Sequence, residues 1–515
     1  MAAERMRLLR RNLVSTYVVY GASVLAALVV TPVIVHALGK EAYGLWVFIG
    51  SITVFVQLLD LGVGPSVVRF GAHARGARTP EEISALASVG IVVYAIIGAA
   101  TVVVGVVLAV VVPYLISIPD DLVDPARAAT LLVVAGIAVR FPMGLFNNLL
   151  LGQQRYDVVN LGNLVGLVVY FVLVVSILPW YGGIVLLAAV TLLSTVVRLG
   201  VPLVWLRREL PFLRLRRALV SRLRVRELLS FSWHNFLIHL ASKVAYSSDV
   251  IVVGIVLGAK AAALYGVPSR IFGLVLGLGT GATDLLYPAF AELEGADERR
   301  RQRRLLLAGL RLGMALMLLL ALPLVLIPDQ LIYGWIGPGW GPSSAVLALL
   351  GIVLLVHQPA QLLSQYLVAR GYQQRLSMML LFVVGANLVL SIVLARSVGI
   401  WGVAFATVVT EAAATLMLIP RLVHRSPDGP SYRAVARAAL RPVLPSLLAA
   451  ALVLVVFSRL LDPRTLLELV PVGVLWVLAF AIAVWFLGLD DADRSAISSR
   501  LGMRRSRRSL ASASE

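Results

Sequence analysis

A small set of ionisable side chains lies deep inside the apolar stretches of this sequence, where a charge is costly to hold. Such groups normally face a cavity or a charged partner, so each of them marks a candidate functional position. Arginine and lysine could bind an anion there, and a buried carboxylic acid could carry a proton or ligate Na⁺. The cations are Arg140, Arg198, Lys243 and Arg270, and the acids are Asp60, Asp249, Asp284 and Glu411.

A structural interpretation stays open for each of these positions. Asp60 would then hold its helix against a neighbour through a hydrogen bond, and Arg140 would pair with helix carbonyls. Arg69 would be an anchor at the level of the lipid headgroups rather than a substrate ligand. The cations and the acids are equal in number, so the sequence alone does not establish a cationic cavity.

Helical geometry groups the polar residues of the second apolar stretch. Gln57, Asp60 and Gly64 lie within about 60° of one another around a helix. Pro65 follows them, removes a backbone donor and is expected to kink the helix at that point. The functional interpretation makes Asp60 part of a cavity wall or a gate, and the structural interpretation makes it a hydrogen-bonding residue that holds this helix against its neighbour.

The second half of the chain carries similar groups. Arg270 and Asp284 are fourteen residues apart, which places them within about 40° of each other around a helix. Lys243 lies near the middle of its stretch. His234 and His239 do not share a helix face, so they predict no metal site.

The composition indicates a protein that crosses a membrane many times. Of the 515 residues, 60% are hydrophobic and 14% are charged, which is too little polar surface to cover a water-soluble globule. Most of the chain lies in apolar runs of about 20 residues, the length that spans ~30 Å of hydrocarbon. The runs are continuous and do not alternate, so the expected fold class is all-α. The absence of cysteine excludes disulfides, thiolate metal sites and thiol catalysis.

Apolar runs and their breakers predict fourteen transmembrane helices. Basic residues collect in every second connection, which predicts that this side and both termini are cytoplasmic. The net charge of +19 is explained by this orientation and does not indicate a nucleic acid as partner. The predicted spans are 13–37, 43–70, 84–114, 128–150, 158–179, 183–206, 229–257, 262–290, 304–327, 343–369, 376–397, 400–423, 438–460 and 465–488.

Three pairs of sequence anchors recur at a constant offset of 219 residues, which indicates a tandem duplication. Six spans fill this interval, so the two halves share one orientation and are expected to be related by an axis along the membrane normal. The anchor pairs are Leu38-Gly39 with Leu257-Gly258, Gly152 with Gly371, and Gly183 with Gly402. The predicted parts are a lobe at 1–206, a basic linker at 207–228 expected to form an amphipathic helix on the inner leaflet, a second lobe at 229–424, a cytoplasmic loop at 425–437, a helix pair at 438–488 and a disordered cytoplasmic tail at 489–515.

Three local motifs carry a resemblance to a known family. AYGLW follows the first span, LLDLGVG lies in the second and SDVIVVGIVLG ends the seventh. In this order and spacing they resemble the bacterial polysaccharide (O-antigen, Wzx-type) flippases of the multidrug/oligosaccharidyl-lipid/polysaccharide (MOP) exporter superfamily. The resemblance covers the first twelve spans well and the last two only by their number. It implies a transporter of the bacterial cytoplasmic membrane that moves undecaprenyl-diphosphate-linked oligosaccharide to the outer leaflet by alternating access, as in O-antigen and lipopolysaccharide synthesis.

The resemblance also implies roles for the ionisable residues, because a diphosphate needs fixed cations and arginine offers it a bidentate fork. The candidate substrate-binding residues are Lys243, Arg140, Arg198, Arg270 and Arg69. The candidates for gating, or for coupling to H⁺ or Na⁺, are Asp60, Asp249, Asp284 and Glu411. No catalytic residue, metal or cofactor is implied. The expected partners are the lipid-linked oligosaccharide, membrane lipids, and the polymerase and glycosyltransferases of the same pathway.

Two other functions stay open. A lipid II or multidrug exporter of the same superfamily would share the fold, although extruders normally have twelve spans and the deep arginines weigh against drug export. A membrane polysaccharide polymerase or ligase would need catalytic groups, often on a sizeable external loop. The external connections of this chain are short and hold no DxD motif or Ser/His/Asp arrangement. We therefore expect a transporter and not an enzyme.

Overall fold

The computed structural model describes residues 2–226 except 78, residue 228, residues 247–455 except 285 and 427, residues 465–489, and residues 494, 495 and 498. These residues are largely helical and include no β-strand, which confirms the all-α prediction. Contacts divide the chain into two compact units, residues 1–266 (unit 1) and residues 267–515 (unit 2).

Twelve helices among the described residues are long and apolar enough to cross a membrane, so the predicted number of fourteen is not confirmed. One reason is that the first predicted span, 13–37, and most of the second, 43–70, fall in a single helical stretch, Val14–Asp60. The other is that most of the predicted span 229–257 lies outside the described residues, and its described part is the short apolar helix Ser247–Leu257.

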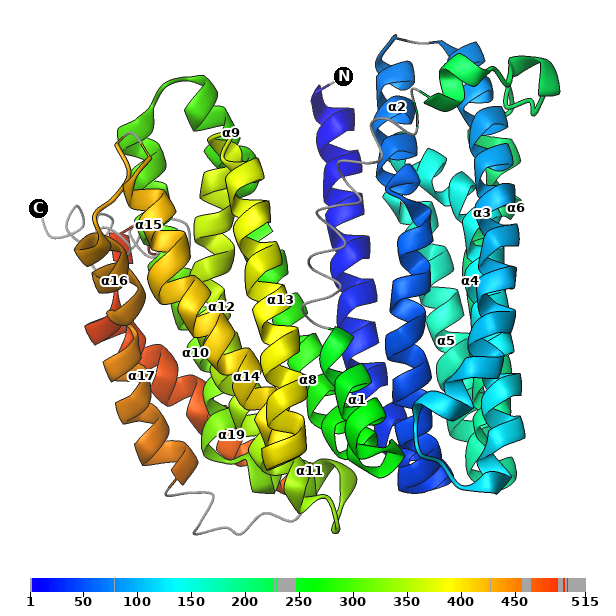
Figure 1. The fold of residues 1–515 in the computed structure, drawn as a ribbon. Coiled ribbons are helices and arrows are strands. Elements are labelled where there is room, and N and C mark those ends of the chain that lie inside the picture. The colour runs from blue at the N-terminus through cyan, green and yellow to red at the C-terminus, as the bar shows by residue number, and fades with distance from the viewer. Residues whose placement is uncertain are drawn as a thin grey trace, which may run out of the picture. The chain divides into compact units, whose positions relative to one another are not determined.

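Helix α1 (Ala2–Val56) contains a sharp reversal at Gly39, where φ is 73° and ψ is 175°. A side chain would be strained at this positive φ, whereas glycine adopts it readily. Figure 1 shows the consequence: the first helical segment runs from the N-terminus to one end of the unit, and the second runs back beside it. The predicted turn between the first two spans is therefore present, although the helix is nearly continuous.

Unit 1 is built around α4, which packs against α2, α3 and α6, while α5 packs against α1 and α6. Buried leucines and valines of these helices form its apolar core, among them Val63, Val67 and Leu145. After α1 the helices are the 3₁₀ turn η1 (Gln57–Asp60), α2 (Val63–Ala77), α3 (Pro80–Leu115), α4 (Val123–Gly152), α5 (Tyr156–Tyr181) and α6 (Ile184–Glu209).

Two glycines of α5 set its distance from α6. A Cβ added at Gly162 would lie 2.5 Å from the carbonyl oxygen of Arg198, and one added at Gly166 would lie 2.5 Å from the Cβ of Arg198. Small residues four apart on a membrane helix allow such a close approach of two backbones. The position of Arg198 is therefore fixed by direct backbone packing of α5 on α6.

The second predicted span, 43–70, is interrupted earlier than its proline suggested. The helix tightens into η1 and stops at Leu61 and Gly62, whose φ angles are 50° and 78°. Helix α2 then begins at Val63, so Pro65 lies in its first turn, where a missing N–H removes no helical hydrogen bond. The expected kink at Pro65 is wrong, because the backbone has already changed direction before it.

The predicted linker 207–228 does not form one amphipathic helix in its described part. Helix α6 ends at Glu209, and the chain then continues in extended backbone with short helical turns. Serine hydroxyls of α3 accept hydrogen bonds from this extended backbone, which offers its amides an alternative to a helix. The bonds run from the Arg214 amide to Ser84 Oγ at 3.3 Å and from the Arg216 amide to Ser88 Oγ at 3.0 Å.

The division between the two units falls inside α8 (Ala259–Asp284), after Gly266. Residues 247–266 belong to unit 1 because they pack on α1: a Cβ at Gly254 would meet the Phe48 ring at 2.3 Å, and Lys260 pairs with Glu41 at 2.9 Å. The lobe boundaries drawn from the sequence stay a prediction.

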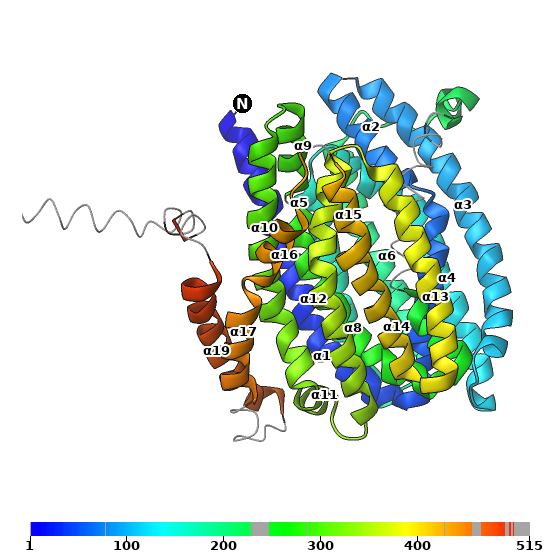
Figure 2. The ribbon, with the colours of Figure 1, turned by 60° about the vertical axis from the view of Figure 1, so that its left-hand side comes forward.

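Unit 2 is centred on α12, which packs against α10 and α14. Trp476 of α19 donates a hydrogen bond to the carbonyl of Leu319 on α10 at 2.9 Å, and Figure 2 shows α17 and α19 at the edge of this unit beside α10. After α8 the helices are α9 (Tyr287–Gly295), α10 (Arg299–Leu326), α11 (Pro328–Ile336), α12 (Gly341–Ala369), α13 (Gln373–Val398), α14 (Ile400–Ala413), α15 (Ile419–His424), α16 (Tyr432–Leu440), α17 (Val443–Ala450) and α19 (Leu466–Ala483).

Candidate functional site

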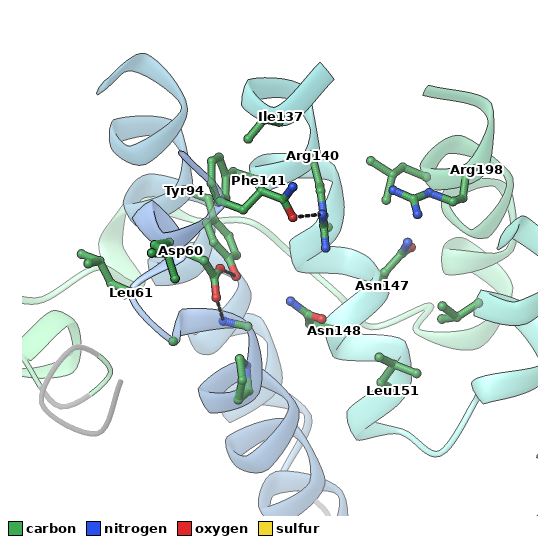
Figure 3. Close-up of a pocket in the computed structure, with 18 of the residues that line it drawn as sticks. Asp60, Leu61, Tyr94, Ile137, Arg140, Phe141, Asn147, Asn148, Leu151 and Arg198 are labelled. Carbon is green, nitrogen blue, oxygen red and sulfur yellow. Dashed lines mark hydrogen bonds between the residues drawn. The ribbon is translucent and has the colours of Figure 1, made fainter. Parts of the chain in front are cut away.

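A pocket of about 410 Å³ lies within unit 1, where the break after α1 faces α3, α4, α5 and α6 (Figure 3). Its lining is polar for a site inside a bundle of apolar helices. The polar side chains are two arginines, one aspartate, one tyrosine and several carboxamides. They are Arg140, Arg198, Asp60, Tyr94, Gln57, Asn147, Asn148 and Asn163.

Arg140 reaches the pocket from α4, and its side chain is exposed there. Its Nη1 donates a hydrogen bond of 2.8 Å to the Gln57 side-chain oxygen, which belongs to η1. This neutral partner orients the guanidinium, and no carboxylate of the described residues lies within salt-bridge distance of it. The remaining donors of the fork stay available for an anion.

Arg198 enters the same pocket from α6 and is half-buried. Among the residues that the structure describes, it has neither a hydrogen-bond partner nor a carboxylate partner. Its charge lies close enough to Arg140 for the two guanidinium groups to repel each other. An uncompensated cation inside an apolar helix bundle is costly, so this pair is suited to receive an oxyanion through charge-assisted hydrogen bonds.

Asp60 is held by two donors at the helix break. The Tyr94 hydroxyl donates to Oδ1 at 2.7 Å, and the amide of Gly64 donates to Oδ2 at 3.2 Å. Tyr94 is itself fixed, because only 2% of it is exposed and its ring stacks on Phe141 with centroids 5.8 Å apart. Asp60 therefore satisfies a free amide at the start of α2 and ties the break to α3.

The structure thus brings three of the predicted site residues together: Arg140, Arg198 and Asp60 line one pocket. Arg69 lies on α2 outside this pocket, with its guanidinium 6.0 Å from the Phe70 ring, and Arg270 is exposed on α8. Lys243, like His234 and His239, lies outside the described residues.

Each of the other predicted acids has a partner within its own unit. Asp249 is buried in unit 1 and accepts a hydrogen bond of 2.8 Å from the Tyr265 hydroxyl. In unit 2, Asp284 accepts one of 2.7 Å from the Gln365 side chain.

Glu411 and His357 form a pair in unit 2. The Glu411 carboxylate lies 2.6 Å from Nδ1 of His357, and both side chains are largely buried. No group of three or more histidines, acids or cysteines with metal-binding geometry occurs in the part of the chain that the structure describes.

The sequence alone does not single out four of the polar residues that line this pocket: Tyr94, Asn147, Asn148 and Asn163. A weak signal exists for each, because a hydroxyl or carboxamide in the middle of an apolar span needs a partner. Which of these side chains meet depends on the packing of different helices, and helical periodicity within one span does not report it.

Comparison with known proteins adds the family. A family described as polysaccharide biosynthesis protein matches residues 9–294, more than half of the chain. No curated protein matches the chain. Solved structures share its fold at low sequence identity, and they include the lipid II flippase MurJ in an inward closed conformation, with 14% identity, a TM-score of 0.68 and coverage of 91% of this chain and 99% of that one.

Two further structures come from the MOP superfamily. An inward-facing multidrug resistance MATE family transporter has 17% identity and a TM-score of 0.64, and covers 79% of this chain and 96% of its own. A transporter from Pyrococcus furiosus, whose binding pocket is described as of reverse polarity, has 16% identity and a TM-score of 0.57, with coverage of 80% and 94%. The chain belongs to the polysaccharide biosynthesis protein family and has the fold of the MOP superfamily.

Proposed function

We propose that this protein is a flippase that carries undecaprenyl-diphosphate-linked oligosaccharide across the bacterial cytoplasmic membrane by alternating access. The observation that supports this function is the pairing of Arg140 and Arg198 in one pocket of an apolar helical unit, with no carboxylate on Arg198 among the described residues. A diphosphate would supply the missing negative charge.

Electrostatics favours such a ligand. Burying an unpaired charge carries a desolvation penalty of several kcal/mol, which an opposite charge with good hydrogen-bond geometry offsets. Two guanidinium groups offer several donors in fixed planes, a better match to two linked phosphates than to a single carboxylate. We assign Arg140 and Arg198 to the diphosphate. Lys243, Arg69 and Arg270 stay proposed substrate contacts at other points of the transport path.

The coupling of transport to an ion is part of the same proposal. Asp60, Asp249, Asp284 and Glu411 are the candidates for gating or for carrying H⁺ or Na⁺. Among these, Glu411 contacts His357 Nδ1 at 2.6 Å, so its carboxylate is held in place by a side chain of another helix. We place both termini in the cytoplasm, and the polymerase and glycosyltransferases of the pathway are the proposed protein partners.

Lipid II is the second candidate substrate, because it also carries a diphosphate and because the structural similarity extends over 99% of a lipid II flippase. Export of cationic drugs is disfavoured by the same two arginines, which would repel such compounds. A polymerase or ligase would need a catalytic set that the pocket does not offer, since its one carboxylate is engaged by Tyr94 and Gly64.

Transport by purified protein in liposomes tests the substrate assignment. We expect the wild-type protein to speed the appearance of a fluorescent undecaprenyl-diphosphate oligosaccharide in the opposite leaflet, measured by its accessibility to an added glycosidase. Lipid II is expected to cross more slowly, and a cationic dye is not expected to be transported. Protein-free liposomes give the background rate. Preferred transport of lipid II would reassign the substrate, and glycan polymerisation without translocation would overturn the flippase function.

A further inference from the structure

Asn147 is a buried polar side chain of the pocket whose acceptor is not used. It is 8% exposed, and its Oδ1 atom is buried without a hydrogen-bond partner in the described structure. Native proteins pair nearly all buried polar atoms with protein or water, so this atom needs an explanation. A ligand that donates a hydrogen bond would provide it.

The position of Asn147 relates it directly to the arginine pair. It lies on α4 seven residues after Arg140, so the two residues share a helix face about 10 Å apart along the axis. In the view of Figure 3 the Asn147 side chain lies next to the Arg198 guanidinium. All three line the same pocket. A ligand group held by the arginines would therefore continue past Asn147.

The neighbouring carboxamides do not have this property. The Gln57 oxygen accepts from Arg140, and Asn148 interacts through its side chain with Tyr94. Neither of the two has a buried acceptor without a partner. Asn147 is therefore the pocket residue in the described structure that lacks an internal partner for a buried oxygen.

We propose that the Asn147 carboxamide is a sugar subsite, in which Oδ1 accepts a hydrogen bond from a hydroxyl or amide N–H of the sugar attached to the diphosphate. The inference rests on the proposed function. Of the three parts of such a substrate, the diphosphate offers only acceptors at neutral pH and the lipid tail has no polar groups. The sugar is the part that carries donors, and it follows the diphosphate directly.

The size of the pocket limits what this subsite can read. A volume of about 410 Å³ lies at the small end of the range of about 300–1,000 Å³ that ligand sites occupy. It suits the diphosphate with its first sugar and not a whole oligosaccharide. Selection at Asn147 would therefore act on the first sugar, and the residues beyond it could vary.

Equilibrium binding to the full-length protein in detergent tests the subsite with three probes: farnesyl diphosphate, its glucosyl derivative and its N-acetylglucosaminyl derivative. We expect the wild-type protein to bind a sugar-bearing probe about tenfold or more tightly than farnesyl diphosphate. Asn147→Leu and the smaller Asn147→Ala are expected to lose this ratio and to keep the affinity for farnesyl diphosphate within about twofold, which also shows that they are folded.

The control and the two sugars sharpen the result. The control variant is Asn160→Leu. The Asn160 carboxamide lies outside the pocket and donates to Ser15 and Thr16, so this variant should keep the wild-type ratio of the two affinities. If both sugar-bearing probes bind more tightly than farnesyl diphosphate, the donor is a sugar hydroxyl. If only the N-acetylglucosaminyl probe binds more tightly, the donor is its amide N–H.

Two different failures can be told apart. In the first case farnesyl diphosphate binds and Arg140→Gln weakens its binding, so the diphosphate site stands. The subsite is then wrong if the sugar adds no affinity, or if both Asn147 variants keep the wild-type ratio. An equal loss of the ratio in Asn160→Leu also overturns the assignment to Asn147. If no probe binds in a way that depends on Arg140, the proposed function fails and the subsite falls with it.

Discussion

Replacing Arg198 by glutamine is expected to abolish transport of the lipid-linked oligosaccharide while the protein still reaches the membrane. Glutamine keeps a polar side chain but removes the charge and most donors of the guanidinium fork. Truncating one partner of a desolvated charge pair typically costs about 2–5 kcal/mol, so substrate affinity should fall by a factor of about 30 or more. Arg140→Gln should act in the same direction, and binding of farnesyl diphosphate measures both.

Thermal unfolding separates loss of binding from loss of folding in these variants. Arg198 has no anionic partner in the described structure and is repelled by Arg140, so its removal should leave the melting temperature unchanged or raise it. The matched control is Arg127→Gln on α4, because Arg127 forms an exposed pair with Asp124 outside the pocket. Wild-type transport by Arg198→Gln, or a marked loss of stability without any loss of affinity in the remaining folded protein, would contradict the assignment.

Replacing Asp60 by alanine is expected to lower both stability and transport. The substitution leaves the buried Tyr94 hydroxyl and the Gly64 amide without their acceptor, which should cost about 1–3 kcal/mol for each group that stays unpaired. The break after Asp60 would then be less well fixed, and Gln57, which lies in the same 3₁₀ turn, would no longer hold Arg140 in place. Thermal unfolding and the transport rate in liposomes measure the two effects.

Two further variants decide how Asp60 acts. Asp60→Asn keeps an oxygen for the Tyr94 hydroxyl but does not titrate, so a positioning role predicts substantial transport, whereas a role in proton coupling predicts none. Tyr94→Phe removes the same hydrogen bond and keeps the stacking on Phe141, so it should resemble a mild form of Asp60→Ala. If Asp60→Asn has wild-type stability but does not transport, the positioning role is wrong and Asp60 acts in proton coupling.

The sequence predicted most helices of unit 1 well, because their apolar runs are long and bounded by clear breakers. The run expected at 84–114 is α3, Pro80–Leu115, and the one expected at 158–179 is α5, Tyr156–Tyr181. The break at Leu61 was missed because leucine rarely adopts a positive φ and carries no local signal for it. The extended course of the linker was missed for a related reason, since its amides bond to serines more than 100 residues away.

The candidate site was predictable as individual residues and not as an arrangement. Arg140 and Arg198 stood out because a charge in an apolar run is costly. The two arginines reach one pocket because of the way α6 packs on its neighbours. Gly162 and Gly166 of α5 set this packing, because they let α5 approach α6 closely. For the same reason, the partnership of Glu411 with His357 joins two helices that are far apart in sequence, and the period of either helix alone does not reveal it.

We propose above that Arg140 and Arg198 together hold the diphosphate of a lipid-linked oligosaccharide. The most direct measurement is an experimental structure of the protein with this substrate bound in a membrane mimetic. We expect phosphate oxygens within hydrogen-bond distance, roughly 2.7–3.2 Å, of both guanidinium groups. A bound substrate whose diphosphate lies away from both arginines, with the pocket between them empty, would contradict it.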